Sequence, residues 1–506
     1  MKKSIAILAF FYFAVPGIKS QSEWNFLPGL SYPQAQITDM IVDDDNIIVY
    51  GDAFNNAIEW KQGLLIAKLD TIGTVLKEVF LLDSLGDKFA VDDLWGKIIP
   101  TSDGGYAATA ATVSRESAFL IKLDHDLDVE FIREYPDTVN LSNFFYNLRE
   151  VSGGYLLFGQ VQLPNYQLVC FVKRTDQAGD ILWERLYTNT NFPNNLLDLD
   201  VLNDSTFVFV TVELLEPLVT GGMPEDGRSG IYKIDGQGNV LAYYQTQAAP
   251  DIGYMRKVVA LEDGSFITYG LARKDIYINT ELVQPTLTRF DSTMTIQWSY
   301  SFGRITSLGG KHLLDFERLP DGNILGSGQF GVKNSEGLTR GQGWLYKFSP
   351  AGDSIWGRHF PPPFPDIESV TGTLFGSGVL SSGRIMAGGY AREGSNYLCW
   401  IVKIDNNGCM DTLFCQTSAL HEAPETKAGL RVYPNPATQT QVRIEAPEKI
   451  ASVELSDLSG RLLTSYPAPG STGVTLQLPA LLPAGVYIIT VRYVRGGVSH
   501  RRLFVE

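Results

Sequence analysis

The chain has few of the residues that build metal centres and nucleophilic active sites. Its 506 residues include only four cysteines and five histidines. The histidines stand singly, whereas a zinc site needs closely spaced ligand pairs. No Gly-x-Ser-x-Gly elbow, His-Glu-x-x-His pair or glycine-rich phosphate loop occurs. The sequence therefore predicts no metal and no cofactor, and it leaves enzymatic activity open while leaning against it.

Long apolar runs and net positive charge are also missing from most of the chain. Beyond residue 20 no segment approaches the ~20 apolar residues that span a bilayer. The net charge is −15, and because residues 1–20 and 430–506 each carry +3, the segment between them carries −21. So acidic a body repels nucleic acid and anionic membrane surfaces, which excludes both as expected partners.

The first twenty residues have the pattern of a secretory signal peptide. Lys2 and Lys3 supply the positive start, and an apolar stretch follows from Ile5 to Val15. We expect cleavage between Ser20 and Gln21. No cysteine stands near this point, so a lipid anchor there is not expected.

Two of the four cysteines lie close together in the sequence. Cys409 and Cys415 flank a predicted turn, and in an oxidising compartment they could form a disulfide. The spacing alone does not establish the required geometry. Cys170 and Cys399 stand in apolar, strand-like runs, where a buried and inert thiol is the simpler interpretation.

A pattern of a basic residue two positions before an acidic turn recurs seven times, at spacings of 52 to 59 residues. The copies contain Lys68 and Asp70, Lys122 and Asp124, Arg174 and Asp176, Lys233 and Asp235, Arg289 and Asp291, Lys347 and Ser349, and Lys403 and Asp405. Each unit of ~55 residues has room for four short strands between glycine-rich turns. An open solenoid would have shorter repeats and a chain of sandwiches longer ones. Residues 21–415 are therefore predicted to form a seven-bladed β-propeller.

Three further features of the repeat have structural interpretations. A small residue recurs in the second strand of each unit, which permits close backbone approach near a crowded axis; these residues are Gly51, Ala110, Gly159, Thr211, Gly270, Gly328 and Gly389. Aromatic residues at one fourth-strand position are predicted to pack between blades rather than to bind sugars: Phe131, Trp183, Trp298 and Trp356. The segment 21–28 is expected to add a strand to the last blade and close the ring.

The repeated charges suggest a functional ring, but a structural role is favoured. Aspartate caps a tight turn by accepting hydrogen bonds from nearby backbone N–H groups. Alternate residues of an outer strand face water. The repeated Lys and Arg side chains are therefore predicted to point into solvent.

After Cys415 the repeat stops. Residues 416–429 are polar and are predicted to be a linker. Residues 430–506 contain six or seven short strand-like runs separated by Gly and Pro turns, which predicts a small immunoglobulin-like β-sandwich. The overall fold class is therefore all-β.

This tail resembles the type A C-terminal sorting domain of the Bacteroidetes type IX secretion system. The resemblance is carried, in order, by the segments 432–437, 453–461 and 482–489. Its motif residues are Tyr433, Pro434, Asn435, Pro436, Gly460, Arg461, Gly485 and Tyr487. The family often has Lys before its last strand, where this chain has Arg501 and Arg502.

The resemblance implies export through the periplasm to the outer-membrane surface or the extracellular space, with the type IX secretion machinery as a partner. The tail of such proteins is commonly removed, and the linker is where we expect the cut. Whether the body is then released or anchored is left open. Without the resemblance, the tail would be interpreted as an accessory immunoglobulin-like binding module.

Three functions remain for the propeller. The favoured one is non-catalytic binding of a glycan or protein ligand, because propellers present loop-rich faces. The alternative is a polysaccharide hydrolase or lyase with carboxylates at the channel, for which the candidates are Asp198, Asp200, Asp251, Asp315 and Glu317. A calcium site at the acidic cluster 43–46 is the least favoured, because a solvated hairpin turn explains that cluster.

Overall fold

The computed structural model divides the chain into two compact units, Met1–Glu422 and Ala423–Glu506. The structure describes residues 24–32, 34–55, 61–83, 85, 88–91, 96–113, 117–137, 139–140, 142–164, 168–187, 194–214, 227–246, 254–275, 282–302, 306–307, 311–333, 339–364, 370–410, 430–433, 437, 441–446, 448–456, 462–468, 470–479, 482, 485–494 and 498–505. The predicted signal peptide with its Ser20–Gln21 cut, Asp251, Cys415 and the linker 416–429 lie outside the described residues.

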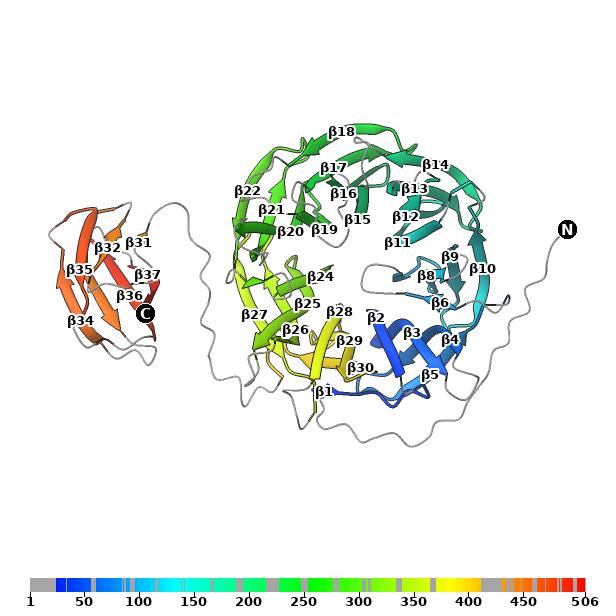
Figure 1. The fold of residues 1–506 in the computed structure, drawn as a ribbon, viewed down its shortest axis with the longest axis horizontal. Coiled ribbons are helices and arrows are strands. Elements are labelled where there is room, and N and C mark those ends of the chain that lie inside the picture. The colour runs from blue at the N-terminus through cyan, green and yellow to red at the C-terminus, as the bar shows by residue number, and fades with distance from the viewer. Residues whose placement is uncertain are drawn as a thin grey trace. The chain divides into compact units, whose positions relative to one another are not determined.

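The described residues of the first unit form seven antiparallel sheets arranged as the blades of a ring (Figure 1). Blade 1 contains β2 (Gln34–Asp43), β3 (Asn46–Asn55), β4 (Lys61–Leu69) and β5 (Val75–Leu81). Blade 2 contains β6 (Phe89–Ala90), β7 (Ile98–Pro100), β8 (Tyr106–Thr112), β9 (Ala118–Leu123) and β10 (Val129–Tyr135). Blade 3 contains β11 (Ser142–Val151), β12 (Gly154–Gln162), β13 (Leu168–Asp176) and β14 (Ile181–Tyr187). Blade 4 contains β15 (Asn194–Asn203), β16 (Thr206–Leu214), β17 (Gly227–Asp235) and β18 (Val240–Gln245).

The remaining blades follow the same plan. Blade 5 contains β19 (Tyr254–Ala260), β20 (Phe266–Asp275), β21 (Leu282–Phe290), β22 (Ile296–Ser301) and β23 (Thr306–Ser307). Blade 6 contains β24 (Lys311–Arg318), β25 (Ile324–Lys333), β26 (Thr339–Phe348) and β27 (Ser354–Phe360). Blade 7 contains β28 (Val370–Val379), β29 (Ile385–Glu393), β30 (Asn396–Ile404) and, from the other end of the chain, β1 (Asn25–Phe26). The predicted seven-bladed propeller is confirmed.

The ring is closed by β1, as the sequence predicts. Asn25 pairs with Val402 and Phe26 with Ile401, so the start of the described chain supplies the outermost strand of blade 7. The Trp400 indole N–H also donates to the Asn25 side-chain oxygen at 2.6 Å. The first and last blades are thereby held together by strand pairing as well as by packing.

The turn aspartates cap their turns, as predicted. Asp70 Oδ1 accepts hydrogen bonds from the N–H groups of Ile72 and Thr74 at 3.0 and 2.8 Å. Gly73, the fourth residue of that turn, has φ of +86°, a conformation that glycine adopts without the strain a side chain would add. The Asp-to-Gly spacing in the repeat therefore reflects turn geometry.

The prediction that the repeated basic side chains point into solvent is wrong. Lys68, Lys122, Lys347 and Lys403 are all buried. The ammonium groups of Lys68 and Lys403 donate to the turn carbonyls of His125 and Thr71, each in the neighbouring blade. The reason is that the third strand lies inside the sheet, so its long side chains reach across to the next blade's turn.

The repeated aromatic residues pack between blades, as predicted. The Trp183 indole N–H donates to the Gly236 carbonyl oxygen at 3.0 Å, and that of Trp356 donates to the Asn406 carbonyl at the same distance. A side chain on Gly238 would collide with the Trp183 ring. Each of these indoles is therefore seated on the turn of the following blade.

The second unit is a two-sheet sandwich, as predicted. One sheet contains β31 (Arg431–Tyr433), β32 (Gln441–Glu445) and β35 (Gly473–Gln477); the other contains β34 (Leu462–Pro467), β33 (Ile450–Ser456), β36 (Gly485–Tyr493) and β37 (Val498–Val505). Its core includes Val442, Ile444, Val453, Leu455 and Leu503, all with at most 1% of their surface exposed. The apolar residues alternate along each strand and face the space between the two sheets.

The cysteines follow their predicted roles as far as the structure describes them. Cys170 and Cys399 are free and buried. Burial raises the pKa of both thiols, which keeps them protonated and unreactive. Cys409 is in a disulfide. Its predicted partner, Cys415, lies outside the described residues, so that pairing stays a prediction.

Candidate functional site: the propeller channel

The innermost strand of six blades contains a β-bulge. In β2, β11, β15, β19, β24 and β28 the register shifts by one residue, so that one residue of the strand is skipped in the pairing with the second strand. The residues after the bulge are Asp39, Asn147, Asp198, Lys257, Asp315 and Gly376. In blade 2 Lys97 takes this place, opposite Thr109, whose N–H donates to the Lys97 carbonyl.

The repeated small residue of the second strand is explained by these bulges. Gly159 is paired with Phe145, the residue before the bulge. A Cβ on Gly159 would overlap the carbonyl oxygen of Phe144, and one on Gly328 would overlap that of His312. The sequence predicted a close backbone approach here; the structure places that approach at the bulge of the inner strand.

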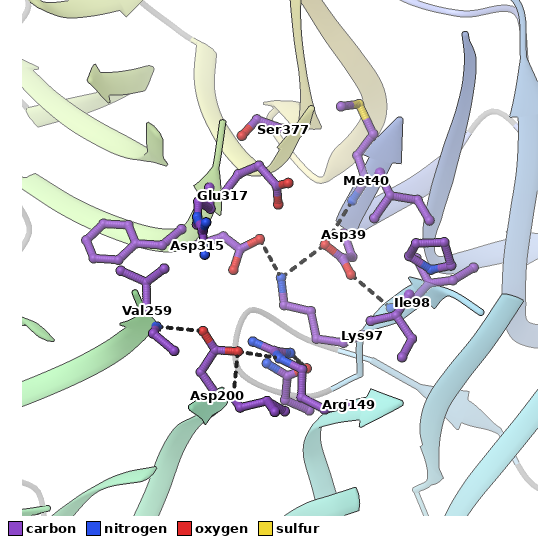
Figure 2. A pocket seen from close by; sticks show the side chains of 18 of the residues that line it. Asp39, Met40, Lys97, Ile98, Arg149, Asp200, Val259, Asp315, Glu317 and Ser377 are labelled. Atoms are coloured by element: carbon purple, nitrogen blue, oxygen red, sulfur yellow. Dashed lines mark hydrogen bonds and ion pairs between the residues drawn. The ribbon is translucent and has the colours of Figure 1, made fainter. Parts of the chain in front are cut away.

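The inner strands enclose a cavity of about 540 Å³ in the channel. Charged groups and aliphatic side chains such as Ile41, Ile99 and Val259 line it. Figure 2 shows Lys97 between Asp39 and Asp315, with Glu317 projecting from the strand that carries Asp315.

Lys97 joins two carboxylates from blades that are not neighbours in the ring. Its Nζ lies 3.0 Å from Asp39 Oδ1 in blade 1 and 3.1 Å from Asp315 Oδ2 in blade 6. Burial by itself lowers the pKa of Lys97, but Asp315 and Asp39 outweigh burial and raise it. Burial raises the pKa of Asp39, whereas at Asp315 the ammonium groups of Lys97 and Lys257 outweigh burial and lower it.

A second network joins blades 3, 4 and 5. The Asn147 amide donates to Asp198 Oδ1 at 3.0 Å, and Arg149 Nε donates to Asp200 Oδ1 at 3.1 Å. The other oxygens of Asp198 and Asp200 accept from the backbone N–H groups of Val258 and Ala260. These carboxylates therefore hold one inner strand against the next.

Lys257 and Glu317, beside this network, have the fewest hydrogen-bond and ion-pair partners of its charged neighbours among the described residues. Within the described residues the only partner of the Lys257 ammonium is Asp315 Oδ1, at 4.0 Å, and burial lowers the pKa of Lys257. Glu317 has no hydrogen bond or ion pair to any described residue, although its side chain opens to the cavity. Enclosure by the channel walls, followed by the charge of Asp315, raises the pKa of Glu317 to about 8.

Four of the five carboxylates predicted as channel candidates come together here: Asp198, Asp200, Asp315 and Glu317. Asp251 lies outside the described residues. Sequence reasoning missed Asp39, Lys97, Arg149 and Lys257. For Asp39, Lys97 and Lys257 the signal was a position 12 or 13 residues before the second-strand small residue, where the residue type differs from blade to blade. Arg149 lies two residues beyond that position in its blade, so the repeat gave no signal for it.

The acidic cluster 43–46 is a hairpin turn, as predicted. Asp44 and Asp45 have positive φ between β2 and β3. The carboxylates point to different neighbours: Asp43 accepts from the Tyr106 hydroxyl and Asp45 from Ser381. Within the residues that the structure describes, no group of three or more His, Cys, Asp or Glu side chains could hold a metal ion.

Of the motif residues in the tail, three are described. Tyr433 lies in β31, with its hydroxyl donating to Glu445 at 2.6 Å; Gly485 begins β36, and Tyr487 is buried in the core. Residues 434–436, Gly460 and Arg461 lie outside the described residues. Residues 431–506 match the family described as the secretion system C-terminal sorting domain. This tail is a type IX secretion sorting domain.

The sorting domain indicates export to the cell surface or the extracellular space and an interaction with the type IX secretion machinery. The part of the chain that the structure describes includes no helical segment with the length and hydrophobicity of a bilayer span.

A search of curated proteins finds no match. Among solved structures, similarity is found to three proteins in particular. A protein of unknown function from Bacteroides caccae is 12% identical, with a TM-score of 0.31, covering 54% of this chain and 85% of the other. The phage phi92 endosialidase is 10% identical, with a TM-score of 0.38, covering 94% and 86%. The polysaccharide lyase Uly1 is 8% identical, with a TM-score of 0.40, covering 77% and 93%. With identities and TM-scores this low, these similarities do not indicate an activity for this protein.

Proposed function

We propose that this exported propeller binds a glycan or protein ligand in its channel cavity without chemical turnover. The observation that supports this is the engagement of the channel carboxylates. Asp39, Asp198 and Asp200 each accept a hydrogen bond from the backbone of the adjacent blade, and Asp39 and Asp200 are also paired with cations. Glycoside hydrolysis needs two carboxyl groups that flank the scissile bond, one donating a proton and one acting as base or nucleophile. Among the five channel carboxylates discussed above, Glu317 alone has no partner within the described residues.

Export and processing belong to the same proposal. Residues 1–20 act as the signal peptide, and the tail is removed within the linker 416–429 once the outer membrane has been crossed. Mass spectrometry of the protein recovered outside the cells tests both cuts. A mature body that begins at Gln21 and ends within the linker is expected, and an intact tail on the exported protein contradicts the second cut.

The binding function is tested with the full chain on a glycan array and a panel of labelled polysaccharides, recording binding and product release together. Binding without product over hours supports the proposal. Soluble product that grows with time overturns it.

Hydrolysis or lysis of a polysaccharide is the second candidate, and Glu317 is the observation in its favour. A carboxyl group with a pKa of about 8 stays protonated at neutral pH and can donate a proton to a leaving group. If turnover is found, Glu317→Gln is expected to lower it by roughly 100-fold or more. Turnover that survives this substitution places the chemistry elsewhere.

A further inference from the structure

Carboxylates outnumber cations in the channel. Among the described residues, Asp39, Asp198, Asp200, Asp315 and Glu317 meet Lys97, Arg149 and Lys257, while Arg318 at the cavity rim pairs with Glu262 and leaves the excess unchanged. All three cations have at least one carboxylate partner. The unmatched charge is therefore negative when Glu317 is ionised.

The remaining capacity to accept hydrogen bonds is concentrated on one side of the cavity. Asp39 and Asp200 each accept three hydrogen bonds, two of them from backbone N–H groups. Asp315, with 24% of its side chain exposed, receives a contact of hydrogen-bond length from Lys97 alone among the described residues. Glu317 receives none from the described residues, and Ser377 lies on the same side of the cavity (Figure 2).

We propose that this side of the cavity binds a primary ammonium group carried by a small ligand, with Glu317 as its anionic partner and Asp315 and Ser377 beside it. This rests on the binding function proposed above. An ammonium group has three donors and one positive charge, which complements an unpaired carboxylate and its acidic neighbour. An anionic ligand would add to the acid excess. A divalent cation needs several converging carboxylates, which the described residues do not supply.

An amino sugar suits the rest of the cavity. Ile41, Ile99 and Val259 offer aliphatic surface for the C–H groups of a sugar ring. Arg149 donates from Nε to Asp200 and from one terminal nitrogen to Asn147 and Leu148. Among the described residues its other terminal nitrogen has no acceptor, so it can donate to a sugar hydroxyl.

Binding is expected to release a proton. The charged groups that face Glu317 are Asp315 on its own strand, Arg149 on β11, Asp200 on β15 and Lys97 before β7. With these neighbours the carboxyl is protonated at pH 6.5, whereas an amine of ordinary pKa is charged. An ammonium group beside Glu317 favours the carboxylate, so each bound ligand displaces up to one proton into the buffer.

The test compares glucosamine oligomers with N-acetylglucosamine oligomers, which differ by the positive charge, on the full chain by calorimetry at pH 6.5. The proposal expects the amine form to bind at least 10-fold more tightly. Repeating the titration in two buffers of different ionisation enthalpy measures the released proton. Nα-acetyl-lysine amide, whose side-chain amine is free, is titrated alongside. It distinguishes an amino sugar from a lysine side chain as the source of the ammonium group.

Two matched variants localise the effect. Glu317→Gln is expected to weaken binding of the amine form at least 10-fold and to abolish proton release. Glu262→Gln makes the same substitution at the cavity rim, where the carboxylate is already paired with Arg318, and it is expected to change neither. Melting curves of both variants establish that they fold.

The outcomes separate this inference from the binding function. Equal binding of the amine and N-acetylated forms overturns the ammonium site, as does unchanged binding by Glu317→Gln. If the array finds a neutral or acidic ligand instead, that result contradicts the ammonium site but still supports the proposed binding function. Product release overturns the binding function itself.

Discussion

Polar side chains follow the inner-strand bulge in five blades, and Lys97 holds the equivalent position in blade 2, where apolar side chains could have filled the channel. Lys97 is the central group, because it is the only described residue that joins carboxylates of blades 1 and 6. Buried charges are tolerated when each is paired, and removing one partner leaves the others uncompensated. The stability of the channel should therefore depend strongly on this one lysine.

Replacing Lys97 by methionine keeps most of the side-chain volume and removes the charge. The expected cost is about 3 kcal/mol or more in the free energy of unfolding, because Asp39 and Asp315 lose their shared cation. Urea denaturation at pH 7 measures this cost. Below about pH 5 the deficit should shrink, because the two carboxyl groups can then be neutralised by protons.

Lys77→Met is the control for that experiment. Lys77 pairs with Asp128 at 2.7 Å, but 65% of the Asp128 side chain is exposed. A pair of this kind contributes only ~0–1 kcal/mol. Equal losses in the two variants would contradict the central role of Lys97.

Glu317 should make the folded protein less stable as the pH rises. Its pKa is about 8 in the folded chain and 4.5 when unperturbed, so between these values the folded state binds more protons than the unfolded state. Stability contributed by the protonated group is then complete below pH 4.5 and is lost as the pH rises toward 8. Glu317→Gln removes this dependence.

The measurement is the melting temperature of both proteins from pH 5 to pH 9. The difference between the variant and the wild type should move in favour of the variant as the pH rises. A constant difference across that range would mean that the Glu317 pKa is not raised by folding.

At the scale of strands, the bulge is the element that builds the site. It reverses the side-chain alternation along the inner strand, and in blade 3 the Phe144 carbonyl, two residues before Tyr146, which the register skips, lies close to the second strand. Gly159 lies at this contact in blade 3, and Ala110 stands at the same repeat position in blade 2.

Gly159→Ala should therefore destabilise the protein by roughly 1–3 kcal/mol, because the Phe144 carbonyl must move to admit the new methyl group. The reverse change at the matched position, Ala110→Gly, should cost at most about 1 kcal/mol, the usual penalty for added chain freedom. Thermal denaturation compares them. Equal costs would mean that the bulge can relax around a side chain.

The repeat allowed the blades, the turns and the small residues to be predicted from sequence, because those features recur at one spacing. The residues of the channel site could not be predicted in the same way. At the post-bulge position the seven blades carry Asp39, Lys97, Asn147, Asp198, Lys257, Asp315 and Gly376. Aligning the repeats by their identical residues does not detect a position at which the residue differs from blade to blade. The chain also contains many other acidic residues that were equally plausible candidates.

The repeated lysines show the opposite difficulty. Their recurrence was evident, but strand alternation was the wrong guide to their environment. Lys68 reaches a carbonyl in the next blade, a contact between segments more than fifty residues apart that no local pattern encodes. Local turn chemistry was predictable, whereas contacts between blades needed the ring.

At the scale of the whole propeller, closure depends on a two-residue strand. Phe26 in β1 has only 2% of its surface exposed, and its ring occupies the space that a side chain on Gly73 would need. Phe131 lies beside Gly179 at the corresponding place between blades 2 and 3, in looser contact, and the chain runs directly from β10 of blade 2 into β11 of blade 3. Both positions carry a phenylalanine next to a turn glycine, but they differ in how the chain connects the two blades.

Phe26→Ala should cost about 3–5 kcal/mol and should open the ring, because β1 is continuous in sequence with blade 1 but is held to β30 of blade 7 only by strand pairing and side-chain contacts. Phe131→Ala should cost less, since the Phe131 ring is only half-buried and its blades remain tethered. Hydrogen exchange distinguishes local from global loss: in Phe26→Ala protection should fall first in β30 and β2, on either side of the joint, whereas in Phe131→Ala it should fall in β10 and β13. If Phe26→Ala leaves β30 as protected as the other blades, closure is maintained by the lysine and aspartate contacts between blades rather than by the strand.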